Sequence, residues 1–167
     1  AKIQEDAYLN YAKLSYEIGN PYQSVPEIMN AYLAKYPNTS YKQEINTLLI
    51  SSYITSKNYK EALVLLEKSK SPENKLAYQK VTFYRGLELY TDGDFKGAYS
   101  LFKKSIAENK DAKFSARATF WKGETEYNLD QFEEAKLSFL QFLNSSEAST
   151  TPEFKNANYN LAYAYFK

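Results

Sequence analysis

Acidic residues occur in close pairs that could in principle perform acid–base catalysis. Glu124 with Glu126, and Glu133 with Glu134, are two such pairs. Two carboxylates can share a substrate only if they face each other, and residues one or two positions apart on a helix do not. We therefore interpret both pairs as solvated surface charge.

The residue types that most catalytic and metal sites need are missing. The sequence has no cysteine and no histidine, which removes thiolate nucleophiles, imidazole bases and the usual zinc ligands. The sequence offers no general base that could activate the serine pairs Ser51–Ser52 and Ser145–Ser146. None of the five glycines lies in a glycine-rich run of the kind that binds phosphate. We predict that the chain is not an enzyme, has no catalytic residue, and binds no metal and no cofactor.

Charge and hydropathy exclude two further classes of partner. The chain has 21 Lys and Arg against 20 Asp and Glu, a formal net charge of +1. Proteins that bind phosphate backbones or anionic lipid surfaces usually carry a basic excess. No run approaches the roughly 18 apolar residues that a membrane helix needs. We expect no nucleic-acid partner and no direct insertion into a membrane.

Aromatic residues are the most unusual feature, with 17 Tyr and 10 Phe in 167 residues. Rings offer a large contact area at a low entropic cost, and arginine can bind a carboxylate through two hydrogen bonds. We predict that a groove for a protein or peptide is lined by Lys80, Phe83, Tyr84, Tyr90, Arg117, Phe120, Trp121, Tyr127, Tyr159 and Tyr163. The alternative is that most of these rings form ordinary core, since aromatics at helical spacing usually serve packing.

These side chains belong to a sequence repeat. Five positions recur in register 37 residues later: Gly86, Phe95, Ala98, Phe102 and Ile106 become Gly123, Phe132, Ala135, Phe139 and Leu143. Earlier and more degenerate counterparts of Phe95, Ala98 and Phe102 are Tyr59, Ala62 and Leu66, and before them Tyr22, Val25 and Met29. The chain therefore holds about four and a half copies with a period of 36–37 residues.

The spacing within each copy is that of helices. Apolar residues follow the i, i+3, i+4, i+7 stripe of one helix face, and no alternating strand pattern occurs. Turn-forming segments such as Asp92–Gly93–Asp94 separate two helices per copy. Pro26 predicts a helix that starts late, with the proline in its first turn. We predict one all-α array over residues 1–167, with copies at about 6–40, 41–75, 76–112 and 113–151, and the first helix of a fifth at 152–167.

This pattern resembles the tetratricopeptide repeat (TPR). The likeness lies in a small residue midway along the first helix, an aromatic at the start of the second, an alanine three residues on and a large apolar residue four beyond that. Gly86 and Gly123 would let the partner helix approach closely, and Ala98 and Ala135 would lie where two helices cross. The resemblance implies a right-handed α-solenoid that acts as a protein-interaction scaffold, with a partner held on its concave face.

Two segments resemble bacterial cell-envelope TPR proteins. They are Phe120–Glu124 followed by Tyr127, and Tyr32–Asn38 followed by Ser40. The relatives meant are the periplasmic protein associated with the Tol-Pal system and the lipoproteins of outer-membrane assembly. The resemblance implies a location in the periplasm or at the outer membrane, while the cytoplasm stays open.

Another TPR function is disfavoured by the residues themselves. The carboxylate clamp that binds chaperone tails uses Lys and Asn on successive first helices, and the matching positions here hold Asn10, Leu14, Leu48, Lys80 and Tyr84. Two alternatives remain open. The chain could bind glycans, since Tyr and Trp also stack on sugar rings, or it could be a regulatory segment of a larger multidomain protein.

The last predicted helix carries an apolar stripe formed by Tyr159, Leu161, Ala162, Tyr165 and Phe166. Terminal repeats of a complete array normally present a polar outer face. We therefore expect that the chain is a fragment and that the natural protein continues through at least another helix. We expect the isolated fragment either to fray after about Pro152 or to pair end to end with a second copy.

Overall fold

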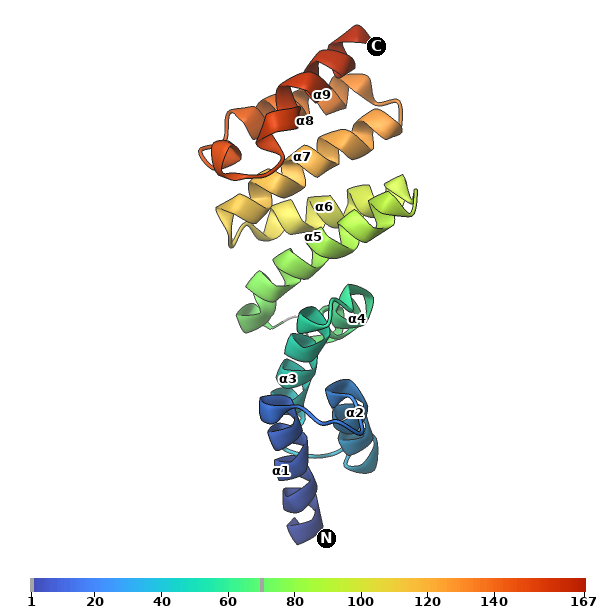
Figure 1. Cartoon of the computed structure of the whole chain (residues 1–167), viewed down its shortest axis with the longest axis vertical. Coiled ribbons are helices and arrows are strands. Elements are labelled where there is room, and N and C mark those ends of the chain that lie inside the picture. The colour runs from blue at the N-terminus through green and yellow to red at the C-terminus, as the bar shows by residue number, and fades with distance from the viewer. Residues whose placement is uncertain (1, 70) are drawn as a thin grey trace. The chain divides into compact units, whose positions relative to one another are not determined.

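The structure is a computed structural model that describes residues 2–69 and 71–167. Within these residues it contains nine α-helices, two short 3-10 helices and no strand, which confirms the predicted all-α class. The elements are α1 (Lys2–Ile18), α2 (Val25–Lys35), α3 (Lys42–Thr55), α4 (Tyr59–Ser69), η1 (Pro72–Asn74), α5 (Lys75–Thr91), α6 (Phe95–Glu108), α7 (Ala112–Asn128), α8 (Phe132–Leu143), η2 (Ala148–Thr150) and α9 (Phe154–Phe166) (Figure 1). No helix in the described part is long and apolar enough to cross a membrane.

The helices divide between two compact units, residues 1–68 and 69–167. The first unit holds α1 to α4 around a core whose buried members are Leu9, Ala12, Ile28, Met29, Tyr32, Ile45 and Leu49. Pro26 lies in the first turn of α2, as predicted, and Ser24 and Glu27 form a capping box at that end. Tyr22 and its predicted counterpart Tyr59 have different positions. Tyr59 is the first residue of α4, whereas Tyr22 precedes α2 and is 92% exposed.

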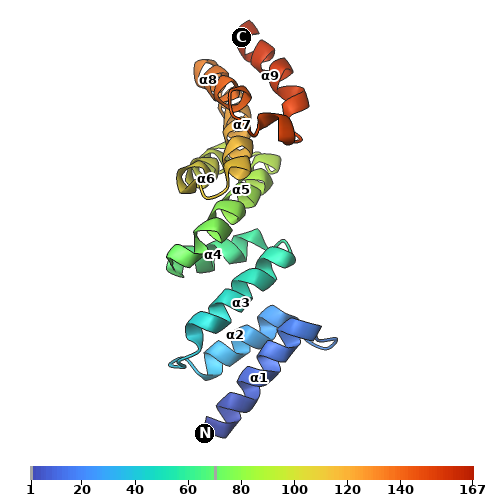
Figure 2. The same ribbon diagram turned by 90° about the vertical axis from the view of Figure 1, so that its left-hand side faces the viewer.

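The second unit holds α5 to α9. In this unit α6 packs on both α5 and α7, and α8 packs on both α7 and α9. The helices α5, α7 and α9 also contact one another in succession. Figures 1 and 2 show the five helices following one another through the unit. This arrangement gives α5, α7 and α9 adjoining surfaces.

Two glycines allow close helix packing, as predicted from their spacing. A Cβ atom added to Gly86 would lie 2.8 Å from Cε1 of Phe102, and one added to Gly123 would lie 2.9 Å from Cε1 of Phe139. Ala98 and Ala135 are both fully buried. The four residues therefore mark where α5 meets α6 and where α7 meets α8.

Gln79 holds the α6–α7 connection in place. Its side chain is fully buried, and its Oε1 accepts hydrogen bonds from the backbone N–H groups of Lys110 (3.0 Å) and Asp111 (2.8 Å). Its Nε2 donates to the Asp111 carbonyl and to Ser115 Oγ, each at 3.0 Å. One amide therefore satisfies several polar groups of the turn that leads into α7.

Candidate functional site

Two of the predicted groove residues lie in the core. Phe83 and Phe120 are buried. The Phe83 ring packs against Phe102 with centroids 6.1 Å apart, and Phe120 packs against Phe139 at 5.6 Å. Neither ring offers surface to a partner in this structure. These two rings therefore belong to the hydrophobic core, which was the alternative to the predicted groove.

Arg117 and Trp121 are engaged by a buried carboxylate. Arg117 Nε donates to both carboxylate oxygens of Glu153, at 2.9 and 3.1 Å, and Trp121 Nε1 donates to Oε1 at 3.0 Å. Glu153 is only 6% exposed and immediately precedes α9. These contacts fix the start of α9 against α7. They also leave Arg117 poorly placed to bind a carboxylate of a partner, the role that its place in the predicted groove implied.

Lys80 and Tyr84 both lie against the Phe114 ring. Lys80 Nζ is 5.5 Å from the centroid of the Phe114 ring. The Tyr84 ring meets Phe114 edge-on at 5.7 Å and Phe83 at 5.3 Å. Both side chains are partly exposed on α5. Neither side chain lines the pocket described next.

The other four predicted residues gather around Glu124. A pocket of about 230 Å³ is lined by Glu124, Tyr127, Phe139, Tyr159, Asn160 and Tyr163. The Tyr159 and Tyr163 rings are 63% and 46% exposed, lie 4.6 Å apart and are joined by a 2.9 Å hydrogen bond between their hydroxyls. We call this surface, formed by Tyr127, Tyr159, Tyr163, Glu124 and Asn160, the α7–α9 face.

Hydrogen bonds from two neighbouring helices hold the Glu124 carboxylate. Asn160 Nδ2 on α9 donates to Glu124 Oε1. The Tyr90 hydroxyl on α5 donates to Oε2 at 3.4 Å and itself accepts from Asn128 Nδ2 at 2.9 Å. Tyr90 thus contacts the site through Glu124, although it does not line the pocket. Its ring packs edge-on against Trp121, with centroids 5.1 Å apart.

Burial perturbs both acids of this network. Burial raises the pKa of Glu124, and the hydrogen bonds from Asn160 and Tyr90 offset part of that effect. Burial, followed by the charge of Glu124, raises the pKa of Tyr90 to about 12. The Tyr90 hydroxyl therefore stays protonated at neutral pH and can act as a donor.

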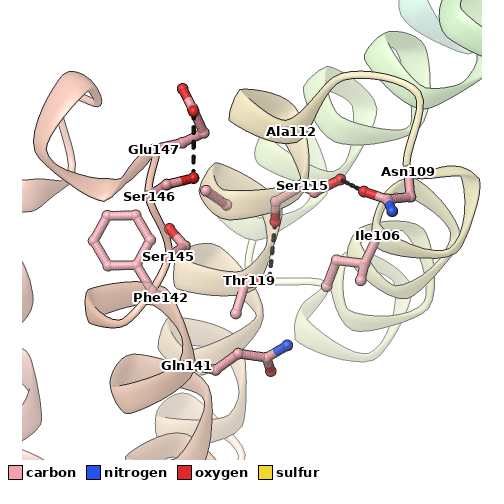
Figure 3. A pocket seen from close by; sticks show the side chains of 11 residues that line it. Ile106, Asn109, Ala112, Ser115, Thr119, Gln141, Phe142, Ser145, Ser146 and Glu147 are labelled. Atoms are coloured by element: carbon pink, nitrogen blue, oxygen red, sulfur yellow. Dashed lines mark hydrogen bonds between the residues drawn. The ribbon is translucent and has the colours of Figure 1, made fainter.

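A second pocket, of about 290 Å³, lies between the α6–α7 connection and the end of α8 (Figure 3). Hydroxyl side chains line much of it, but Ser115 and Thr119 are hydrogen-bonded to Asn109 and to the Ser115 carbonyl, respectively. Ser146 Oγ donates to Glu147 at the long distance of 3.5 Å.

No set of three or more His, Cys, Asp or Glu side chains within residues 2–69 and 71–167 is placed to hold a metal ion. Comparison with known proteins adds no identification, since no protein-family model and no curated protein matches the sequence. The TPR resemblance therefore depends on the spacing of the chain's own residues.

The interpretation of Glu124 and Glu126 as solvated surface charge is wrong, because Glu126 is buried and Glu124 is partly buried in the wall of a pocket. Glu124 is a functional candidate that the sequence analysis did not propose. The positions 37 residues before and after it hold Leu87 and Leu161. A carboxylate at a repeat position that is otherwise apolar was the available signal. Gln79 was missed because the repeat counterpart 37 residues later is the small apolar Ala116, so nothing in the pattern indicates a buried amide.

Proposed function

We propose that this chain is a TPR-type, right-handed α-solenoid that binds a segment of another polypeptide and catalyses no reaction. The observation that carries the proposal is the pair of exposed tyrosines, Tyr159 and Tyr163, beside a pocket on the α7–α9 face. The TPR assignment is supported by the 37-residue spacing and by the close packing at Gly86 and Gly123.

The chemistry of the α7–α9 face suits a polypeptide. Tyrosine combines a large apolar ring with a hydroxyl and loses little conformational entropy when it is fixed, which is why it is enriched at protein interfaces. The pocket volume of about 230 Å³ is below the range of about 300–1,000 Å³ that is typical of small-molecule sites. A single side chain of a larger partner fits this size better than a free metabolite.

Glycan binding is the second candidate. It is favoured by the same exposed rings, because tyrosine faces can stack on sugars, and by the amide of Asn160 at the pocket wall. A location in the periplasm or at the outer membrane, as the sequence resemblance implies, is compatible with either candidate and is tested by fractionation of the source cells.

Selection of peptides from a random display library on the immobilised chain tests the polypeptide proposal. We expect enriched peptides to bind the chain in fluorescence anisotropy and to lose at least about ten-fold in affinity for the Tyr159→Ser/Tyr163→Ser variant, since ten-fold is about 1.4 kcal/mol. Tyr22→Ser is the matched control, because Tyr22 is an exposed tyrosine of the other unit. Circular dichroism checks that each variant keeps its helical content.

The proposal is refuted by two results. One is that no peptide is enriched whose binding depends on Tyr159 and Tyr163. The other is that oligosaccharides bind saturably at this face and compete with one another for it, while peptides do not bind. That result would establish the glycan candidate instead.

A further inference from the structure

The pocket of the α7–α9 face has a carboxylate in its lining. Glu124 contributes to the wall together with Tyr127, Phe139 and three residues of α9. Its oxygens accept hydrogen bonds from Asn160 and Tyr90, both of which are neutral donors. The carboxylate is therefore oriented, but its charge is not neutralised by these bonds.

Other carboxylates of the same unit do have cationic partners. Glu126 is buried and lies 2.5 Å from Lys122 Nζ, and Glu153 is buried and lies 2.9 Å from Arg117 Nε. Among the residues that the structure describes, no lysine or arginine forms an ion pair with Glu124. Burying a charge is unfavourable unless an opposite charge compensates it. Glu126 and Glu153 each have a cationic partner that compensates the buried charge, and the Glu124 carboxylate has none among the described residues.

The rings around Glu124 also favour a cation. Tyr127, Tyr159 and Tyr163 line the pocket, and tyrosine faces attract ammonium and guanidinium groups through their negative quadrupole. The chain already shows this contact elsewhere, since Lys136 Nζ lies 5.0 Å from the centroid of the Tyr165 ring. Aromatic walls also suit the aliphatic stem of a long basic side chain.

We propose that this pocket receives a lysine or arginine side chain of the bound polypeptide, with Glu124 as its counter-charge and the three tyrosines around its stem. The proposal depends on the proposed function and specifies its partner. A neutral side chain or a neutral sugar would cover Glu124 without compensating its charge, so such ligands are disfavoured. The face thus selects for basic segments partly by penalising neutral ones.

Synthetic copies of the peptides selected above provide the test. We expect the selected peptides to share a lysine or arginine. Replacing that residue by its neutral isostere, acetyl-lysine or citrulline, should weaken binding to the wild-type chain at least about ten-fold. The variant Glu124→Gln should show a similar loss for the basic peptide and should no longer distinguish the basic peptide from the neutral one.

Glu134→Gln is the matched control. Glu134 is exposed on α8 and its replacement changes the net charge equally, so any loss that it shares with Glu124→Gln reflects long-range attraction and not the pocket. Peptides that depend on Tyr159 and Tyr163 but bind equally well with citrulline or acetyl-lysine would overturn this inference and leave the proposed function standing. Equal losses in Glu124→Gln and Glu134→Gln would also overturn it. A failure to find any tyrosine-dependent peptide would overturn both proposals.

Discussion

Replacing Gly123 with alanine sets two effects of opposite sign against each other. In the interior of a helix, alanine is favoured over glycine by about 1 kcal/mol. The added Cβ, however, would lie 2.9 Å from Phe139 Cε1, 3.0 Å from Phe139 Cδ1 and 3.2 Å from Ser138 Cβ. Real Cβ atoms essentially never approach another atom more closely than 3.0 Å, so the 2.9 Å contact means that α7 or the Phe139 ring must shift.

The Phe139 ring has little room to shift. It is fully buried, and its centroid lies 5.6 Å from that of Phe120. Adding a methyl group to a packed core usually costs about 1–3 kcal/mol. Subtracting the helix-propensity gain of about 1 kcal/mol leaves a net loss of about 0–2 kcal/mol for Gly123→Ala. We expect a value near 1 kcal/mol in urea unfolding, followed by Trp121 fluorescence and by circular dichroism.

Phe139→Leu supplies the control that separates the two effects. With the ring removed, the methyl group that Gly123→Ala introduces no longer meets it, and the propensity gain outweighs the remaining contact with Ser138 Cβ at 3.2 Å. Gly123→Ala should then stabilise the Phe139→Leu background by about 0.5–1 kcal/mol, a reversal of sign between the two backgrounds. Stabilisation by the full amount of about 1 kcal/mol in the wild-type background would refute the reasoning, because it would show that the ring yields at no cost.

Three further predictions concern other parts of the second unit. Ala135→Leu should destabilise it by about 1–3 kcal/mol in urea unfolding, because Ala135 is fully buried, and a neutral result would mean that the α7–α8 contact is not tightly packed. Gln79→Ala should cost about 2 kcal/mol by the same measurement, because the N–H groups of Lys110 and Asp111 lose their acceptor. Because burial raises the pKa of Glu124, its contribution to stability is present below the ordinary glutamate pKa and is lost as the pH rises through the raised value. Glu124→Gln should therefore gain stability relative to wild type as the pH rises above the ordinary glutamate pKa, measured in a series of urea titrations. An unchanged or opposite trend would contradict the assigned burial effect.

Much of the local fold could be predicted because it depends on short-range patterns. Helical spacing of apolar residues identified the helices, and the position of Pro26 indicated the late start of α2. The glycine–ring contacts were also predictable, since Gly86 and Gly123 recur in register with Phe102 and Phe139. The predicted solenoid depends on how successive helix pairs are placed, and the residue spacing within a pair does not determine that placement.

The site was harder to predict because burial depends on which neighbouring helix covers a ring. Phe83 and Tyr159 are both aromatic residues on a helix. Phe83 is nevertheless buried against Phe102 of α6, whereas Tyr159 is exposed. Likewise, nothing in the sequence indicates that Arg117 and Trp121 both donate to Glu153, about one repeat away. Such contacts arise from tertiary packing and leave no local pattern.

The internal ion pair at Glu153 has a consequence for the proposed binding of a partner. Glu153 is held by Arg117 and Trp121 of α7 immediately before α9 begins. Tyr159 and Tyr163 follow on that helix one turn apart and are joined through their hydroxyls. The two rings are therefore positioned before any partner arrives, which reduces the entropy that binding must overcome. Arg117, predicted as a contact residue, would then act on the partner indirectly, and Glu124 is left as the carboxylate of this face whose charge a partner can neutralise.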